Sequence, residues 1–286
     1  MGAPRDSDAE LLAMLEADMT LDAARPILEL AAGYFADTRR GEGPVSTWHS
    51  ADVIADRLAG PMPRGARSLS DVAHRLSSLL LEDVNRLAHP MYIGHQVSAP
   101  LPAAVWAEAL ISALNQSQAV REMSPSFTPL EHQVIRWMTD LVGWDEQAGG
   151  TITSGGTEAT FAALLAARSR AVPDVWTNGL GANPPVVVCG EHAHYAVSRA
   201  AGEMGLGLSR VITIPSRALC LDTDALRERL TALRANGTRV MAVVATAGCT
   251  ATGSFDDLEA VADLCDAFAD DPGDDLLQFL RAELLQ

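Results

Sequence analysis

The sequence predicts an α/β protein in which a mainly parallel sheet is preceded by a helical N-terminal segment. Three observations support this fold class. Apolar residues recur at helical spacing through the first half of the chain. Short β-rich runs alternate with helical patterns from about residue 150, and these runs are apolar throughout rather than at every second position. Continuously apolar strands are typical of a parallel sheet that helices cover on both faces.

The N-terminal segment, residues 1–100, is expected to be helical. Apolar residues follow helical spacing within 11–34 and again over 69–88. His89-Pro90 is expected to end the second pattern, because the residue before a proline avoids the α-helical region. Loops rich in Gly and Pro are expected at 41–46 and 60–65.

Residues 101–268 are expected to form a partial large domain, and residues 269–286 an acidic linker with a short C-terminal helix. A β-type stretch at 151–153 leads through a glycine-rich turn into a helix at 157–171. The other expected elements are helices at 102–121, 128–143, 194–205, 222–236 and 256–268, and strands at 186–188, 211–214 and 240–246.

The composition excludes several kinds of chemistry. All 21 basic residues are arginine, so the 286 residues contain no lysine and cannot form a Schiff base or use a P-loop lysine. The net charge of −16 argues against nucleic acid as a partner. Four widely spaced cysteines suggest neither a zinc site nor disulfides. With no visible signal peptide and no membrane-length apolar run, we expect a cytoplasmic protein without membrane contact.

The sharpest motif is the string Thr153-Ser154-Gly155-Gly156-Thr157-Glu158-Ala159-Thr160, between an expected strand and an expected helix. Glycines let backbone N–H groups approach an anion, and a helix N-terminus adds unpaired donors and a favourable dipole. With the Thr157 hydroxyl, the turn can hold a phosphate without a lysine. The same string also fits a glycine turn in which Thr157 caps the helix and no ligand binds.

Three further stretches carry polar side chains. His192-Ala193-His194 follows the strand at 186–188, at the edge where ligands bind in open α/β sheets. The two histidines could bind a metal, one imidazole could lie against an aromatic cofactor ring, or both could be surface residues of a loop. No third metal ligand is apparent, so no metal is expected. Ala245–Gly253 fits the same edge or a Gly-rich turn, and His89–Gln96 is uninformative by itself.

The motifs form an ordered set over about residues 50–265. Its members are His89-Pro90, Gly94, Asn115, Ser124-Pro125, Thr128–Glu131, Gly150, Thr153–Ala159, Ala193–Tyr195, Thr246–Gly248, Thr250, Gly253 and Asp256. Taken together they resemble the pyridoxal-phosphate-dependent group II amino-acid decarboxylases, which include the glutamate, aromatic-amino-acid and 2,4-diaminobutyrate decarboxylases. The resemblance implies the type I fold of pyridoxal-phosphate transferases, a pyridoxal 5′-phosphate cofactor, an amino-acid substrate, and a dimer with active sites at the subunit interface. The stretch after His89 is most similar to the bacterial diaminobutyrate decarboxylases.

The resemblance also implies roles for single residues. His192 matches no functional position of the family, and Cys249 stands where its members usually carry a hydroxyl. The residues that match are Gly155, Gly156 and Thr157 at the phosphate, His194 stacked on the pyridine ring, Thr246 lining the cofactor pocket, and Tyr92, His95 and Gln96 in the segment that borders the substrate.

Two family elements have no counterpart after Cys265. One is a His-x-Asp-Ala-Ala strand, whose aspartate pairs with the pyridinium nitrogen; the other is an Asp-x-His-Lys segment, whose lysine forms the Schiff base. The only Asp-Ala-Ala, Asp22–Ala24, lies in an expected N-terminal helix. No catalytic residue is therefore identifiable, and the cofactor is expected to bind only non-covalently.

Three hypotheses remain, in this order. The first is a C-terminally incomplete decarboxylase that is inactive alone. The second is a non-catalytic partner or regulatory subunit that pairs with a complete or complementary decarboxylase chain. The third is an enzyme that uses the phosphate pocket for another ligand, without an amine. The first two imply a homodimer or a heteromer with a related chain, and nothing in the sequence selects the amino acid.

Overall fold

A computed structural model of the chain describes residues 6–62, 65 and 67–269. The chain divides into two compact units, Met1–Asn115 and Gln116–Gln286. The division thus falls after the helix that begins near residue 102, whereas the sequence placed it before that helix. Apart from residue 269, which is helical, the expected linker and C-terminal helix lie outside the described residues.

The N-terminal unit is helical, as expected. Helix α2 begins after the cap Thr20, whose side chain accepts the Ala23 N–H, and it ends at Gly41, which has the left-handed φ of 73°. Helices α2 and α4 pack against each other. The helices are α1 (Asp6–Asp18), α2 (Leu21–Arg40), α3 (Ala51–Leu58), α4 (Leu69–Leu79) and α5 (Pro102–Leu114).

Two helices of this region are shorter than the periodicity predicted. Helix α4 ends at Leu79 instead of residue 88, because the following segment is held by Asp83, whose side chain is only 6% exposed. Asp83 accepts hydrogen bonds from Thr47 at 2.6 Å and pairs with Arg57 at 2.8 Å. Helix α5 ends at Leu114 instead of residue 121. The next residue, Asn115, adopts a left-handed φ of 45° and ends the helix.

The C-terminal unit alternates strands and helices as the sequence predicted. Its strands are β1 (Val186–Gly190), β2 (Val211–Ile214) and β5 (Val240–Val244), with a small antiparallel pair, β3 (Ser216–Arg217) and β4 (Cys220–Leu221). Its helices are α6 (Phe127–Leu141), α7 (Gly156–Ala171), α8 (Val175–Asn178), α9 (Ala196–Glu203), α10 (Thr223–Ala235) and α11 (Leu258–Ala269), with 3-10 turns η1 (Arg121–Met123) and η2 (Leu208–Arg210).

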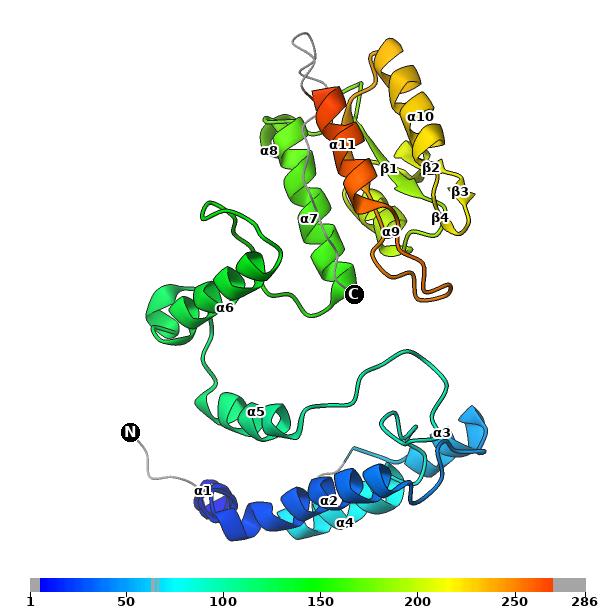
Figure 1. The fold of residues 1–286 in the computed structure, drawn as a ribbon. Helices are drawn as coiled ribbons and strands as arrows, with labels where there is room; N and C mark the ends of the chain where they lie inside the picture. The colour runs from blue at the N-terminus through cyan, green and yellow to red at the C-terminus, as the bar shows by residue number, and fades with distance from the viewer. Residues whose placement is uncertain (1–5, 63–64, 66, 270–286) are drawn as a thin grey trace. The chain divides into compact units, whose positions relative to one another are not determined.

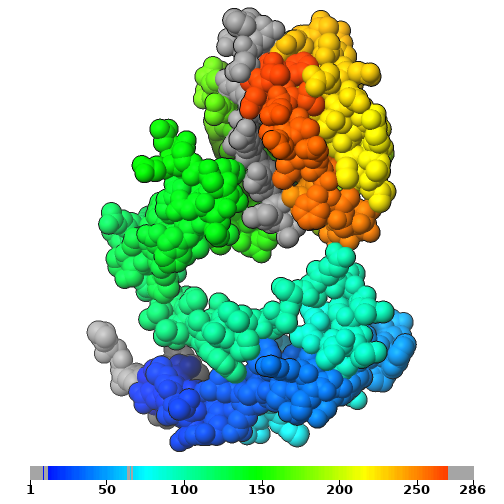
Figure 2. Space-filling model, in the orientation of Figure 1, coloured from blue at the N-terminus to red at the C-terminus, as the bar shows by residue number. Residues whose placement is uncertain are grey.

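The three main strands form a parallel sheet in the order β2-β1-β5, with a helical layer on each face. Val186 and Val188 of β1 pack among residues of α10 and α11, whereas Val187 and Cys189 pack among residues of α7 and α9. Figures 1 and 2 show α10 and α11 side by side in yellow and orange-red. Both faces of β1 are therefore buried, which explains its continuously apolar sequence.

One expected strand does not form. Residues 151–153 have no strand partner among the described residues, and the Ile152 N–H instead donates to the Glu131 carboxylate at 3.1 Å. The β propensity of these residues does not suffice to form a strand, because Ile152 is 55% exposed and gains little free energy by packing.

No helix among the described residues is both long and apolar enough to cross a membrane. The four cysteines all lie in the described part of the chain, and no disulfide joins them.

Candidate functional site

The carboxyl ends of β1 and β5 lie next to each other. The two strands pair in parallel, with Cys189 opposite Val244 near their ends. The segments that follow, Glu191–Tyr195 after β1 and Ala245–Gly253 after β5, therefore leave the sheet at the same edge. The sequence predicted a ligand at this edge.

Helix α7 begins in the glycine turn with its first-turn N–H groups free of any side-chain cap. Gly155 is extended and Gly156 is the first helical residue, and no atom lies within 4 Å of a Cβ built at either position. Thr157 is half-buried, and its hydroxyl has no hydrogen-bond partner among the residues described. The alternative in which Thr157 caps the helix does not hold, because the helix begins one residue before it.

The Glu158 side chain hydrogen-bonds back to Ser154, at the beginning of the glycine turn. Its carboxylate accepts the Ser154 N–H at 2.9 Å and the Ser154 hydroxyl at 2.6 Å. These bonds, chiefly that of the hydroxyl, lower the pKa of Glu158. The first turn is therefore fixed by a carboxylate that is already satisfied, and the N–H groups of Gly156 and Thr157 stay available for an anion.

The structure brings His194 and Thr246 together at one small cavity. Thr160, His194, Val197 and the segment from Val244 to Gly248 line it. Its volume is about 20 Å³, room for about one water. A larger ligand must therefore lie on the outer side of these residues.

Thr160 is the last residue of the predicted motif, but the sequence assigned it no role in this lining. Its hydroxyl donates to the Gly156 carbonyl at 2.9 Å, one turn back along α7. The signal was present, since a residue four positions after Gly156 lies on the same face of the helix. Thr160 is buried and links the glycine turn to His194 and Thr246.

His194 is held by its own backbone and by a neighbouring ring. Its Nδ1 accepts the Ala196 N–H at 3.2 Å, which leaves Nε2 to carry the proton. The Tyr195 ring lies 4.2 Å away between centroids, at 40° to the imidazole. A half-buried imidazole in this position can offer a ring face or one N–H to a ligand.

His192 takes a different position from His194. Its Nε2 lies 3.2 Å from the Ser216 hydroxyl, and Ser216 in turn hydrogen-bonds the Glu191 carboxylate. The hydrogen bond with Ser216 is the main cause that lowers the pKa of Glu191. His192 therefore joins the end of β1 to the β3 strand and does not line the cavity at His194. Among the described residues, no group of three His, Cys, Asp or Glu could hold a metal ion.

Thr246 is positioned by Asp256. The Asp256 carboxylate accepts the Thr246 N–H at 2.7 Å and the Leu221 N–H at 2.7 Å, and the Asp256 N–H donates to the Thr246 carbonyl at 2.9 Å. Asp256 is only 9% exposed. The Thr246 hydroxyl has no partner among the described residues, so it remains available at the sheet edge.

Cys249 lies in the turn that follows Thr246. Hydrogen bonding with the Thr252 side chain is the main cause that lowers the pKa of its thiol. By contrast, burial raises the pKa of Cys189, within β1, to about 11. Of the two thiols, Cys249 is therefore the more readily ionised at the candidate site.

Tyr92, His95 and Gln96 lie in the N-terminal unit, in a loop between α4 and α5. The Tyr92 hydroxyl accepts the His95 N–H at 3.2 Å. A Cβ on Gly94 would come within 2.8 Å of the Tyr92 ring, so glycine is required there unless the ring moves. His95 and Gln96 are exposed. The loop is thus shaped by Tyr92, and the substrate role of its side chains stays a prediction.

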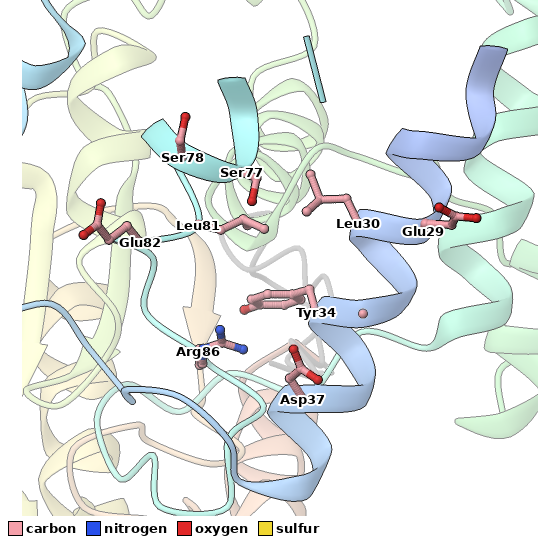
Figure 3. Close-up of a pocket in the computed structure, with 10 residues that line it drawn as sticks. Glu29, Leu30, Tyr34, Asp37, Ser77, Ser78, Leu81, Glu82 and Arg86 are labelled. Atoms are coloured by element: carbon pink, nitrogen blue, oxygen red, sulfur yellow. The ribbon is translucent and has the colours of Figure 1, made fainter. Parts of the chain in front are cut away.

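A larger cavity, of about 520 Å³, lies between α2 and α4 in the same unit. Figure 3 shows the Tyr34 ring at its wall with Arg86 beside it, and the Arg86 guanidinium carbon lies 5.2 Å from the ring centroid. None of the predicted site residues lines this cavity. Its other lining residues are Glu29, Leu30, Gly33, Asp37, Ser77, Ser78, Leu81 and Glu82.

The groups at the sheet edge fit a phosphorylated aromatic cofactor. The free N–H groups and the Thr157 hydroxyl at the start of α7 suit a phosphate. The His194 imidazole and the Thr246 hydroxyl suit the flat face and the polar edge of a ring. These groups therefore suit non-covalent binding of a phosphate and an aromatic ring.

Comparison with known proteins agrees with this chemistry. The family model described as the pyridoxal-dependent decarboxylase conserved domain matches residues 60–271. L-2,4-diaminobutyrate decarboxylase of Acinetobacter baumannii is 31% identical over 210 residues, 68% of this chain and 41% of the relative. The enzyme of the same name from Rhizobium meliloti (strain 1021) is 32% identical over 257 residues, 89% of this chain and 48% of the relative. The chain thus spans less than half the length of these two relatives.

A solved structure shows the same fold. The glutamate decarboxylase domain of the diaminobutyrate-pyruvate transaminase and L-2,4-diaminobutyrate decarboxylase from Vibrio parahaemolyticus superposes with a TM-score of 0.80 and 26% sequence identity. The match covers 93% of this chain and 57% of that structure.

Proposed function

The chain belongs to the pyridoxal-dependent decarboxylase family, and from this premise we propose that it is the cofactor-binding part of an amino-acid decarboxylase. Its C-terminal unit is an α/β unit of the kind found in the type I fold, with part of the large domain's sheet. The observation that carries the proposal is that Thr160, one turn into α7, lines the same small cavity as His194 and Thr246.

Each group at this edge has a distinct task in the proposal. The first-turn N–H groups of α7, from Gly156 onward, and the Thr157 hydroxyl bind the phosphate of pyridoxal 5′-phosphate. His194 packs against the ring, and Thr246 donates or accepts a hydrogen bond at its edge. When bound, the cofactor supplies an electron sink for loss of the substrate's carboxylate.

The substrate and the assembly are also proposals. The relatives suggest a small amino acid with 2,4-diaminobutyrate as the first compound to test, because that name is shared by the two relatives described above. Tyr92, His95 and Gln96 are proposed to border it. We propose a cytoplasmic protein that forms a homodimer under the first hypothesis and a heteromer with a related chain under the second.

The 286-residue chain is proposed to be inactive alone, because it contains no lysine to bind the cofactor covalently. The same observation favours a second candidate function, a non-catalytic or regulatory partner for a complete or complementary decarboxylase chain. The two candidates differ in one outcome: only the second requires that a stable heteromer form.

Pyridoxal phosphate binding tests the main proposal. Equilibrium dialysis should show saturable binding by the purified chain, and borohydride treatment should leave no side chain carrying the cofactor's mass. Thr157→Ala and His194→Ala should each weaken binding roughly tenfold, since each removes a contact of about 1.4 kcal/mol.

The matched control is His192→Ala, because His192 bonds to Ser216 and does not line the His194 cavity. Its affinity should equal that of the unchanged chain. Equal losses in the two histidine variants, or no saturable binding by the unchanged chain, would contradict the proposed cofactor site.

Activity separates the two candidate functions. The chain alone should release no CO₂ from 2,4-diaminobutyrate in the presence of pyridoxal phosphate. Co-expression with a complete related decarboxylase should yield either separate proteins, which supports the first candidate, or a stable heteromer, which supports the second. Turnover by the chain alone would overturn both.

A further inference from the structure

A second polar cavity, of about 390 Å³, lies in the C-terminal unit at the start of α6. No carboxylate lines it, although the chain as a whole carries a net charge of −16. Two guanidinium groups, an imidazole and an amide are gathered there instead, a set that suits an anion. The lining residues are Arg121, Thr128, Pro129, His132, Gln133 and Arg136.

Arg136 is a fixed part of the wall. Its Nε donates to Asp140 at 2.7 Å, its Nη1 to the Asp145 carbonyl at 2.8 Å and its Nη2 to the Trp144 carbonyl at 3.1 Å. The hydrogen bond with Asp140 is the main cause that raises the pKa of Arg136. Because Asp140 balances its charge, Arg136 shapes the cavity and adds little net positive charge.

Arg121 supplies the unbalanced charge. It lies in the 3-10 turn η1 just before α6, and its guanidinium forms no ion pair or hydrogen bond with any residue in the described part of the chain. A guanidinium presents N–H groups in a planar fork that matches the two oxygens of a carboxylate or phosphate. No carboxylate among the lining residues accepts hydrogen bonds from these N–H groups.

Thr128 gives a second, independent indication of a ligand. Its hydroxyl oxygen is buried and has no hydrogen-bond partner among the described residues. Buried polar groups nearly always have a partner, so this hydroxyl is suited to donate to something that enters the cavity. Thr128 also lies in the first turn of α6, which has no acidic residue and no side-chain cap.

We propose that this cavity binds a small oxyanion, a carboxylate or a phosphate. Arg121 binds its oxygens, the Thr128 hydroxyl donates to it from the inner wall, and His132 and Gln133 offer further donors at the exposed mouth. The site is separate from the α7 turn, since the two share no lining residue.

Titration calorimetry with inorganic phosphate and with acetate, at low ionic strength, tests the site on the whole chain. The variants are Arg121→Gln and, as a matched control, Arg229→Gln, an exposed arginine of α10 that makes no ion pair with any described residue. Each variant removes one positive charge. Phosphate that binds at the α7 turn is unaffected by either change, so the difference between the titrations reports on the α6 cavity.

We expect Arg121→Gln to lose at least tenfold in affinity for phosphate, acetate or both, and Arg229→Gln to match the unchanged chain. Thr128→Val should weaken binding while raising the anion-free melting temperature, because it removes an unpartnered buried hydroxyl. Response to only one of the two anions identifies which oxyanion the site takes. Identical titrations for the unchanged chain and Arg121→Gln, or no saturable site in either, overturn the proposal.

Discussion

Asp256 fixes the position of a site residue without lining the site itself. Its buried carboxylate accepts N–H groups from Thr246 and Leu221, two residues that belong to different segments. One side chain thereby ties the turn after β5 to β4. The Thr246 backbone is fully engaged by this contact, which leaves its hydroxyl for a ligand.

Asp256→Asn should destabilise the chain by roughly 2 kcal/mol, because the amide oxygen can accept only one of the two N–H groups and its own NH₂ faces the other. The free energy of unfolding in urea measures this. Asp263→Asn is the control, because Asp263 is exposed on α11. A change of less than about 0.5 kcal/mol in Asp256→Asn would show that the two hydrogen bonds contribute little.

Helix α7 illustrates how an element makes a binding turn. Its start has no side-chain cap, and the Glu158 carboxylate instead reaches back to Ser154. The N–H groups of Gly156 and Thr157 are therefore left without a side-chain partner. A cap at Gly155 would have closed the turn to an anion.

The hydrogen bonds of Glu158 predict that the stability difference between the unchanged chain and Glu158→Gln depends on pH. Hydrogen bonds from Ser154 lower the native pKa of Glu158 below its ordinary value of 4.5. Its contribution to stability is therefore fully present above that value and is lost as the pH falls through the lowered native pKa. Urea midpoints of the unchanged chain and Glu158→Gln should differ at pH 7 and converge at pH 2. A difference that is constant from pH 7 to pH 2 would contradict this account.

At the scale of the whole molecule, helix α5 and the edges of the sheet expose apolar side chains and unpaired strands. Helix α5 has no buried residue, and among the described strands β2 and β5 form open edges of the sheet. Contiguous exposed apolar surface and open edges favour association. The exposed apolar residues on or beside α5 are Leu101 (68%), Trp106 (40%), Leu110 (61%), Ile111 (46%) and Leu114 (46%).

We therefore expect the chain to self-associate, with an average mass in sedimentation equilibrium that rises with concentration. Leu110→Glu should lower that mass, because it places a charge in the apolar surface of α5. Ser198→Glu adds the same charge at an exposed position on α9 and should leave the mass unchanged. A monodisperse monomer at every concentration would contradict the expectation.

The sequence predicted most of the C-terminal unit because its signals are local. The apolar runs that became β1, β2 and β5 and the helix after Gly156 all formed near their expected bounds. The predictions that failed concern segments that tertiary contacts fix. Asp83 holds the segment into which α4 was expected to continue. Glu131 accepts the N–H of Ile152, where a strand was expected. Thr160, the last residue of the predicted motif, received no role from the sequence, because that role depends on residues from two other segments that face it.

By itself the sequence determined the family through the ordered motifs from His89 to Asp256, and it determined the absence of lysine among these 286 residues. Both are properties of residue identity and order. The resemblance had already assigned His194, and not His192, to one cofactor pocket with Thr246. Only the tertiary structure decided that Thr160 lines a cavity with them, and that Arg121 and Thr128 share another cavity. The physical reason is that parallel pairing brings distant strand ends to one edge, and helix packing sets which side chains face each other there.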